Sequence, residues 1–174
     1  KLWSTPVQVQ HSLMEWIELK SGDVVCDVGC GDGRVLIEWA RQISEKEEKN
    51  DATKIRFVGV EIDPERVNEA RCHMDNAMKD GSISSKQISM EMHCANALES
   101  LEVYREATVF FLYLIPRGLR LLKPVLLDAI QNRPVQVVTY MSPLPDEMHV
   151  GKKECKVDHQ PGASWPLYLY RFHC

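Results

Sequence analysis

The sequence predicts an α/β protein of the doubly wound type, with a seven-stranded, mostly parallel sheet whose last strand is antiparallel. Short apolar runs typical of buried strands alternate with longer stretches of helical periodicity, as in parallel sheets covered by helices on both faces. The chain also ends in a hairpin-like pair of runs. At 174 residues and 44% hydrophobic content, residues 1–174 suit a single domain with one sizeable core.

The first half of the chain predicts alternating helices and strands. The first helix is indicated by apolar residues at helical spacing, and the third by an Asp63-Pro64 start and an Asp80-Gly81-Ser82 stop. The charged stretch 44–51 between the second helix and second strand is typical of a solvated connection. We expect helices at 6–19, 35–43 and 64–79, and strands at 24–28, 56–60 and 88–94.

The second half continues the pattern and closes the sheet. We expect a short helix at 97–101, a strand at 108–114, a leucine-rich helix from Pro116 to about Ile130, and strands at 135–141, 154–157 and 166–172. Trp165, Tyr168 and Tyr170 near the last strand fit edge-strand and core packing, with a base-stacking platform as the alternative.

The composition of the chain argues against extensive binding to nucleic acid, a membrane-spanning segment and a metal site. A net charge of -4 and a pI near 5.9 give no general field for a polyanion, so extensive nucleic-acid binding is not expected. No apolar run approaches the roughly 18 residues needed to span a membrane. Six cysteines without a C-x-x-C pair indicate reduced core thiols, and six scattered histidines predict no metal site.

A glycine-rich loop carries the strongest functional signal. Asp27-Val28-Gly29-Cys30-Gly31-Asp32-Gly33-Arg34 follows an apolar strand and opens a helix, so its backbone can approach a ligand closely. A dinucleotide-binding G-x-G-x-x-G counted from Gly29 would need glycine at Arg34, so that fingerprint fails. Asp27 either contacts the ligand or only ties the loop backbone.

An acidic residue stands where a ribose would be bound. Glu61 follows the second strand, and the carboxyl ends of parallel strands face the same crevice. A carboxylate there can accept hydrogen bonds from both vicinal hydroxyls of a ribose. The alternative is an ordinary solvated acid before a turn.

The Asp-x-Gly-x-Gly-x-Gly loop resembles the first motif of the class I S-adenosylmethionine-dependent methyltransferases, which have a Rossmann-like sheet. The resemblance implies S-adenosylmethionine as cofactor and S-adenosylhomocysteine as product. Asn96 stands where the family often has an adenine-binding aspartate, and it can accept the same bond or simply cap the following helix. The implied cofactor-binding residues are Asp27, Gly29, Cys30, Gly31, Gly33, Glu61, Ile62, Asn96, Ala97 and Leu112.

Three segments resemble a narrower group, the small protein-lysine methyltransferases that include enzymes modifying adenine nucleotide translocase and the ATP synthase c subunit. They are Trp3 to Pro6, the glycine loop, and Phe111 to Leu114. The resemblance implies that the N-terminal helical segment 1–20 packs over the cofactor crevice. It places Trp3, Thr5, Tyr113 and Leu114 at the reaction centre, with the backbone carbonyls of Tyr113 and Leu114 orienting the amine.

The sequence therefore predicts a protein-lysine N-methyltransferase whose partner is a protein that offers a lysine side chain. The alternatives are a methyltransferase for RNA or a small molecule, favoured if Arg117, Arg120 and Lys123 form a basic groove, and a non-catalytic cofactor-binding scaffold. At the end of the fourth predicted strand, many enzymes that methylate exocyclic base amines have the motif Asn-Pro-Pro-Tyr. This sequence has Leu112 to Pro116 there instead, which argues against such an enzyme. We expect a reducing intracellular location, cytoplasmic or mitochondrial, and a start at Lys1 leaves room for an upstream targeting segment.

Overall fold

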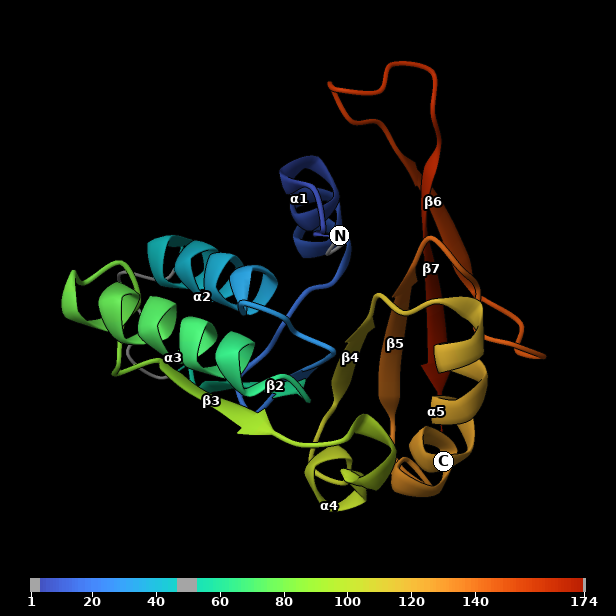
Figure 1. Ribbon diagram of the computed structural model, residues 1–174, viewed down its shortest axis with the longest axis horizontal. Helices are drawn as coiled ribbons and strands as arrows, with labels where there is room; N and C mark the ends of the chain where they lie inside the picture. The colour runs from blue at the N-terminus through green and yellow to red at the C-terminus, as the bar shows by residue number, and fades with distance from the viewer. Residues whose placement is uncertain (1–3, 47–52, 174) are drawn as a thin grey trace.

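The computed structural model describes residues 4–46 and 53–173, which form one seven-stranded sheet with helices on both faces (Figure 1). The strand order is β3-β2-β1-β4-β5-β7-β6. The strands are β1 (Val24–Val28), β2 (Ile55–Glu61), β3 (Ile88–Cys94), β4 (Val109–Leu112), β5 (Val135–Tyr140), β6 (Gly151–Cys155) and β7 (Trp165–Phe172).

Strands β1 to β5 are parallel, and β7 runs antiparallel between β5 and β6. This confirms the predicted doubly wound, mostly parallel sheet with an antiparallel last strand. Because the first five strands are parallel, their carboxyl ends lie along one edge of the sheet. The chain order reverses between β1 and β4, and this switch point is where ligands bind in open α/β sheets.

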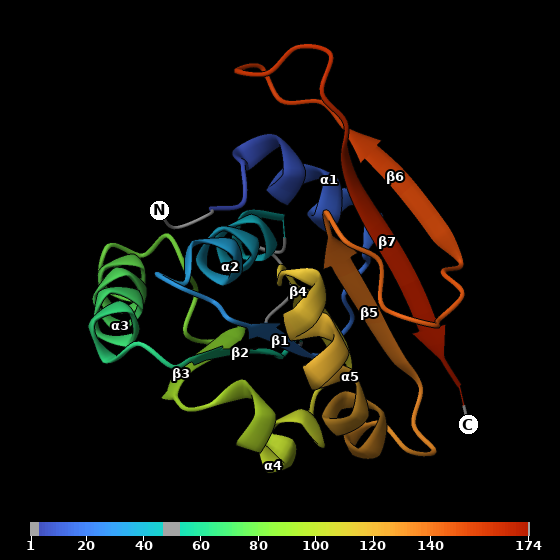
Figure 2. The ribbon, with the colours of Figure 1, turned by 45° about the vertical axis from the view of Figure 1, so that its right-hand side comes forward.

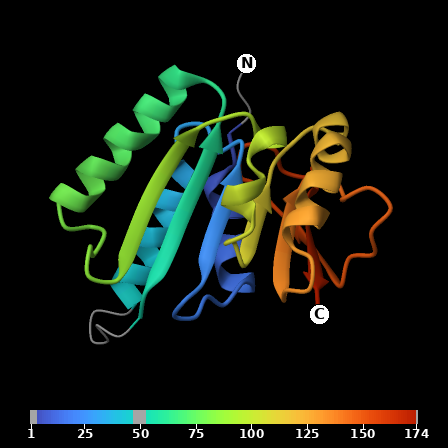
Figure 3. The ribbon, with the colours of Figure 1, turned by 90° about the horizontal axis from the view of Figure 1, so that it is seen from below.

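Within residues 4–46 and 53–173, three α-helices cover one face of the sheet and two cover the other. Residues of α1 (Val7–Trp16), α2 (Arg34–Lys46) and α3 (Pro64–Lys79) share one apolar core with the sheet. A second core packs α4 (Leu101–Tyr104) and α5 (Pro116–Ala129) on the opposite face. Figure 2 shows α1 beside β6 and β7, and Figure 3 shows α4 and α5 in front of the sheet with α2 behind it.

The structure corrects several predicted boundaries. The strand expected at 108–114 ends at Leu112, because its pairing with β1 stops at Val28, where the chain turns into the glycine loop. The strand expected at 154–157 begins earlier, at Gly151, since this edge strand exposes Lys152 and Glu154 and so lacks an apolar signature. The helix expected at 97–101 is a 3-10 turn, Ala97–Glu99, followed by α4.

The first helix is shorter than expected. It ends at Trp16 because Ile17 adopts an extended backbone, whereas the prediction continued to residue 19. The second helix is longer than predicted and continues to Lys46. None of the helices in the described ranges is long and apolar enough to cross a membrane.

Helix α1 is held in place by the antiparallel end of the sheet. Gln8 donates a side-chain hydrogen bond to Asp158 at 3.0 Å, and the Lys153 ammonium donates to the Ser12 carbonyl at 3.5 Å. The ring of Trp16 lies so close to Gly151 that a Cβ there would meet it at 2.7 Å. The start of the described chain is therefore packed against strands near its end.

Candidate functional site

The glycine loop leaves the carboxyl end of β1 in a conformation that favours glycine. Gly29, Gly31 and Gly33 have φ values of 80°, 57° and 76°, in the left-handed region where L side chains are strained. The amides of Gly29 and Cys30 both donate to the Val60 carbonyl of β2, at 2.7 and 3.1 Å. The loop is thus fixed against the neighbouring strand, and its backbone lies open to the crevice.

Gly33 has a packing role in the structure. A Cβ at this position would lie 3.1 Å from both the Ala70 Cβ of α3 and the Met92 Cε of β3. The absence of a side chain therefore lets α2 begin close to its neighbours. Gly33 stands on the helix side of the loop, behind the surface that faces the crevice.

Glu61 connects the glycine loop to the end of β2. One carboxylate oxygen accepts a hydrogen bond from the Gly31 amide at 3.0 Å, and the other accepts from the amides of Ile62 at 2.8 Å and Asp63 at 3.0 Å. Backbone donors thus fix the carboxylate at the point where two parallel strands end. The next residue, Ile62, is 67% exposed although it is apolar, which suits contact with a flat ring.

Asp27 lies beneath the same loop. Its side chain is only 3% exposed, and burial, together with the negative charges of Glu61 and Asp32, raises its pKa to about 8. A buried carboxyl in this state stays largely protonated at neutral pH. A cationic group brought close to Asp27 would favour its ionised form.

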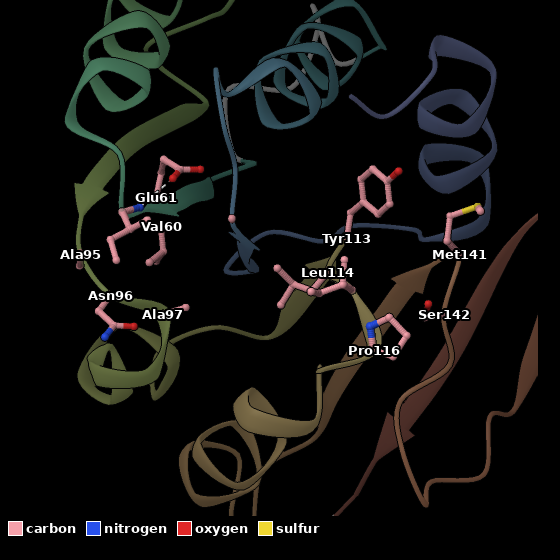
Figure 4. A pocket seen from close by; sticks show the side chains of 13 residues that line it. Val60, Glu61, Ala95, Asn96, Ala97, Tyr113, Leu114, Pro116, Met141 and Ser142 are labelled. Atoms are coloured by element: carbon pink, nitrogen blue, oxygen red, sulfur yellow. Dashed lines mark hydrogen bonds between the residues drawn. The ribbon is translucent and has the colours of Figure 1, made fainter. Parts of the chain in front are cut away.

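Two adjoining cavities run along this edge of the sheet and share Gly29, Glu61 and Tyr113. The larger has a volume of about 560 Å³ and the smaller about 350 Å³. Figure 4 shows Glu61 and Asn96 at one end of the larger cavity, Tyr113 and Leu114 in its middle, and Met141 and Ser142 at the other end. We call the part lined by Tyr113, Leu114, Ile115, Pro116, Met141 and Ser142 the β4–β5 half.

Asn96 caps the turn that follows β3. Its side-chain oxygen accepts a hydrogen bond from the Leu98 amide at 3.0 Å, which is the capping role weighed from the sequence. Asn96 also lines the larger cavity, together with Ala95 and Ala97. The two roles are compatible because the cap uses one lone pair of the amide oxygen.

The β4–β5 half of the larger cavity is apolar apart from two hydroxyl groups, those of Tyr113 and Ser142. The Tyr113 ring packs on the buried Tyr140 ring, with centroids 4.5 Å apart and planes at 55°. Burial raises the pKa of Tyr113, so its hydroxyl remains neutral at physiological pH. Among the residues that the structure describes, no charged side chain lines this half, which suits an uncharged or weakly polar group.

The segment before α1 folds over the smaller cavity. Thr5, which the resemblance placed near the reaction centre, is 6% exposed and lines this cavity. Its carbonyl accepts a hydrogen bond at 2.8 Å from the side-chain amide of Gln10, which is 4% exposed. Trp3, expected in the same region, lies outside the described residues.

Most of the expected site residues come together around the two cavities. Eleven of them line one or both, and nine of these lie around the glycine loop and the end of β4: Thr5, Asp27, Gly29, Cys30, Gly31, Glu61, Ile62, Tyr113 and Leu114. Asn96 and Ala97 join them at the far end of the larger cavity. Leu112 stands apart, fully buried beneath α5 at the end of β4.

The sequence prediction missed Gln10 and the pair Met141 and Ser142. Met141 follows a strand that neighbours β4, so the rule that ligands bind beyond strand carboxyl ends could have found it. Gln10 carries no such signal, because its partner is a backbone carbonyl brought near by the bend at Pro6.

The described residues contain no cluster of His, Cys, Asp or Glu that could hold a metal ion. The basic groove that would favour an RNA or small-molecule acceptor is incomplete. Lys123 forms an ion pair with Glu147 at 3.0 Å and donates to the Pro145 carbonyl at 2.6 Å. Arg117 and Arg120 remain exposed on α5.

Comparison with known proteins gives a consistent family. A family model described as "Methyltransferase domain" matches residues 19–107. A protein named protein-lysine N-methyltransferase from Saccharolobus islandicus is 33% identical over 122 residues, which cover 70% of this chain and 65% of that protein. The human tRNA (uracil-5-)-methyltransferase homolog A is 31% identical over 85 residues, covering 49% of this chain and 11% of that protein.

Solved structures also resemble the chain over nearly its full length, among them a methyltransferase complex. It is described as an RNA methyltransferase from Salinibacter ruber in complex with S-adenosyl-L-homocysteine, and its TM-score is 0.69 at 28% identity. The match covers 98% of this chain and 94% of that chain. By contrast, the chain spans less than two thirds of the length of either sequence relative.

Proposed function

Because the chain belongs to the class I S-adenosylmethionine-dependent methyltransferases, on the evidence of the matching methyltransferase domain, we propose that it methylates a lysine side chain of a protein. S-adenosylmethionine is the methyl donor and S-adenosylhomocysteine the product. The observation that carries the choice of acceptor is the β4–β5 half of the larger cavity, where the part of the chain that the structure describes contributes no charged side chain.

The residues around the cavities fit this cofactor. Glu61 lies where its carboxylate can accept bonds from ribose hydroxyls while backbone amides hold it in place. Ile62 and Ala97 offer apolar contact to an adenine ring. Asp27 and the glycine loop line the smaller cavity, where a cationic amino group would meet a carboxyl group and an open backbone.

When bound, the cofactor supplies a methyl group on a sulfonium leaving group, so the protein mainly positions the reactants and excludes water. The lone pair of the lysine Nζ forms the new N–C bond as the C–S bond breaks, and the nitrogen releases its proton to solvent. A lysine ammonium with pKa near 10.4 must first be deprotonated, at a cost of about 4 to 5 kcal/mol at pH 7.

The β4–β5 half offsets part of this deprotonation free energy by desolvating the lysine ammonium. An apolar environment disfavours the charged ammonium and lowers its pKa. The side chains of Leu114, Ile115, Pro116 and Met141 provide such an environment, and backbone carbonyls after β4 can orient the neutral amine. This arrangement requires no side-chain base.

Two observations bear on the alternative acceptor. The Saccharolobus protein's name supports lysine, whereas the Salinibacter structure's description supports RNA as a second candidate. RNA needs cations that track its backbone. Here Lys123 is already paired with Glu147, which leaves Arg117 and Arg120 on that side of the site and favours lysine.

Transfer of labelled methyl groups to a cell extract fractionated into protein, RNA and small molecules tests the proposal. We expect label in protein, on lysine after hydrolysis, and initial rates that rise between about pH 7 and 9 as more acceptor loses its proton. Label in RNA, or on arginine or glutamine, would replace the lysine assignment while leaving the methyltransferase assignment intact.

Cofactor choice is tested separately by thermal shift. S-adenosylhomocysteine should raise the melting temperature, and NAD should not, because Arg34 stands where a dinucleotide loop needs its last glycine. The reverse pattern of stabilisation would remove the methyltransferase proposal altogether.

A further inference from the structure

Met141 has an unusual backbone for its residue type. It follows the last residue of β5 with φ at 71°, in the left-handed region that costs a residue with a Cβ about 1 to 3 kcal/mol. Its amide donates to the Pro166 carbonyl of β7 at 2.9 Å, so the neighbouring strand holds it in place. Glycine would adopt this conformation without strain.

The strained backbone places Met141 at the β4–β5 half of the larger cavity. Figure 4 shows Met141 and Ser142 at the end of the cavity opposite Glu61 and Asn96, beyond Tyr113 and Leu114. Met141 is 37% exposed, so its thioether borders open space. A cofactor held by Glu61 therefore has Met141 on the side toward which an acceptor would lie.

The wall opposite Glu61 is chemically suited to a chain of methylene groups. Tyr113, backed by the buried Tyr140, supplies a rigid aromatic face, and Met141 supplies a flexible, polarisable side chain. The described residues of this half offer hydroxyl groups but neither a side-chain carboxylate to pair with a guanidinium nor a side-chain amide to read a base edge.

We infer that Met141 is a specificity-determining residue that contacts the aliphatic stem of the acceptor lysine. The inference rests on the proposed lysine methyltransferase function and adds to it the residue that selects an unbranched alkyl chain. It also accounts for methionine at a position whose backbone favours glycine.

The test uses two ligands that need no knowledge of the acceptor protein. One is S-adenosylhomocysteine. The other is its analogue in which nitrogen replaces sulfur and carries an n-butyl chain that imitates the lysine stem. Calorimetry gives the dissociation constant of each for the wild type, Met141→Gly, Met141→Asn, Met141→Leu and the control Met148→Gly, which removes a 93% exposed methionine from the same connection.

Glycine and asparagine tolerate the left-handed backbone, so the melting temperatures of those two variants should equal or exceed that of the wild type. Both should bind S-adenosylhomocysteine within twofold of the wild type but the butyl analogue about fivefold to tenfold more weakly, as expected for the loss of apolar contact with one to two methylene groups. Met141→Leu and Met148→Gly should retain the wild-type ratio of the two constants.

The inference would be overturned if Met141→Gly left the ratio of the two dissociation constants unchanged. Equal weakening of both ligands would be such a result, because Met141 would then affect the binding of the cofactor part that the two ligands share. Failure of the wild type to accept the butyl analogue would overturn it as well. Failure of the proposed function has a different signature: the wild type would not bind S-adenosylhomocysteine, or the transferred label would lie outside lysine.

Discussion

The Glu61 carboxylate and the Gly31 amide, thirty positions apart in the chain, are joined by a hydrogen bond of 3.0 Å. The expected ribose-binding carboxylate and the glycine loop are therefore directly connected. A change at Glu61 should affect the ligand directly and also through the loop.

Glu61→Ala should weaken S-adenosylhomocysteine binding by about 1.5 to 3 kcal/mol, roughly tenfold to a hundredfold. The variant removes a charged acceptor for the ribose hydroxyls and leaves the amides of Gly31, Ile62 and Asp63 without that partner. Calorimetry measures the affinity. Glu65→Ala removes an exposed acid on α3 as a control, and equal affinities in the two variants would mean that the ribose lies elsewhere.

Asp27 should make the unliganded protein less stable as pH rises. The pKa of its carboxyl is 3.8 ordinarily and about 8 in the folded state. Below pH 4 both folded and unfolded forms hold the proton, so this contribution to stability is fully present. Between about pH 4 and 8 the unfolded form loses its proton first, and the contribution is lost.

Asp27→Asn keeps the shape of the side chain without titrating. Its melting temperature relative to wild type should therefore rise between pH 5 and pH 8, measured by thermal denaturation without ligand. Asp75→Asn, which changes an exposed aspartate in the same way, provides the control. Parallel curves for Asp27→Asn and wild type would show that Asp27 does not carry this proton.

Gln10 should support the cofactor crevice although it lines neither of the two cavities along the sheet edge. Gln10→Leu removes the 2.8 Å bond to the buried Thr5 carbonyl and frees the segment before α1. We expect the dissociation constant of S-adenosylhomocysteine to rise severalfold, corresponding to about 1 kcal/mol. Gln8→Ala, which breaks the surface bond to Asp158, should leave it unchanged. Unchanged binding in Gln10→Leu would show that this segment does not contribute to affinity.

Two buried tyrosines should respond oppositely to loss of the hydroxyl. The Tyr140 hydroxyl has no hydrogen-bond partner among the described residues, whereas the Tyr104 hydroxyl donates to the Ala97 carbonyl at 2.7 Å. Tyr140→Phe should therefore stabilise the protein by about 1 kcal/mol, and Tyr104→Phe should destabilise it by a similar amount. Chemical denaturation measures both, and a loss of stability in Tyr140→Phe would reveal an additional partner for that hydroxyl.

Local patterns were sufficient to predict the fold and one wall of the site. Strand-sized apolar runs, the glycine loop and the Asp63 cap each act over a few residues, so the sequence displays them directly. The parallel order then brings Glu61 beside the loop without further information.

The opposite wall was predicted only in part, at Tyr113 and Leu114. Met141 and Ser142 reach the cavity through a left-handed backbone, which hydrophobic periodicity does not report. Tyr113 lies beyond β4 because the pairing with β1 ends, although its aromatic character favoured a longer strand. In both cases a tertiary contact outweighed the local preference.

The packing of α1 against the β6–β7 pair sets the order in which the crevice is completed during synthesis. Gln8 and Asp158 are separated by 150 positions, and Lys153 and Ser12 by 141. Contacts of such long range form late in folding because a large loop must close first. When the glycine loop and Glu61 have emerged from the ribosome, strands β6 and β7, against which α1 packs, have not yet been synthesised. We therefore expect nascent chains to gain affinity for the cofactor only after β7 has emerged.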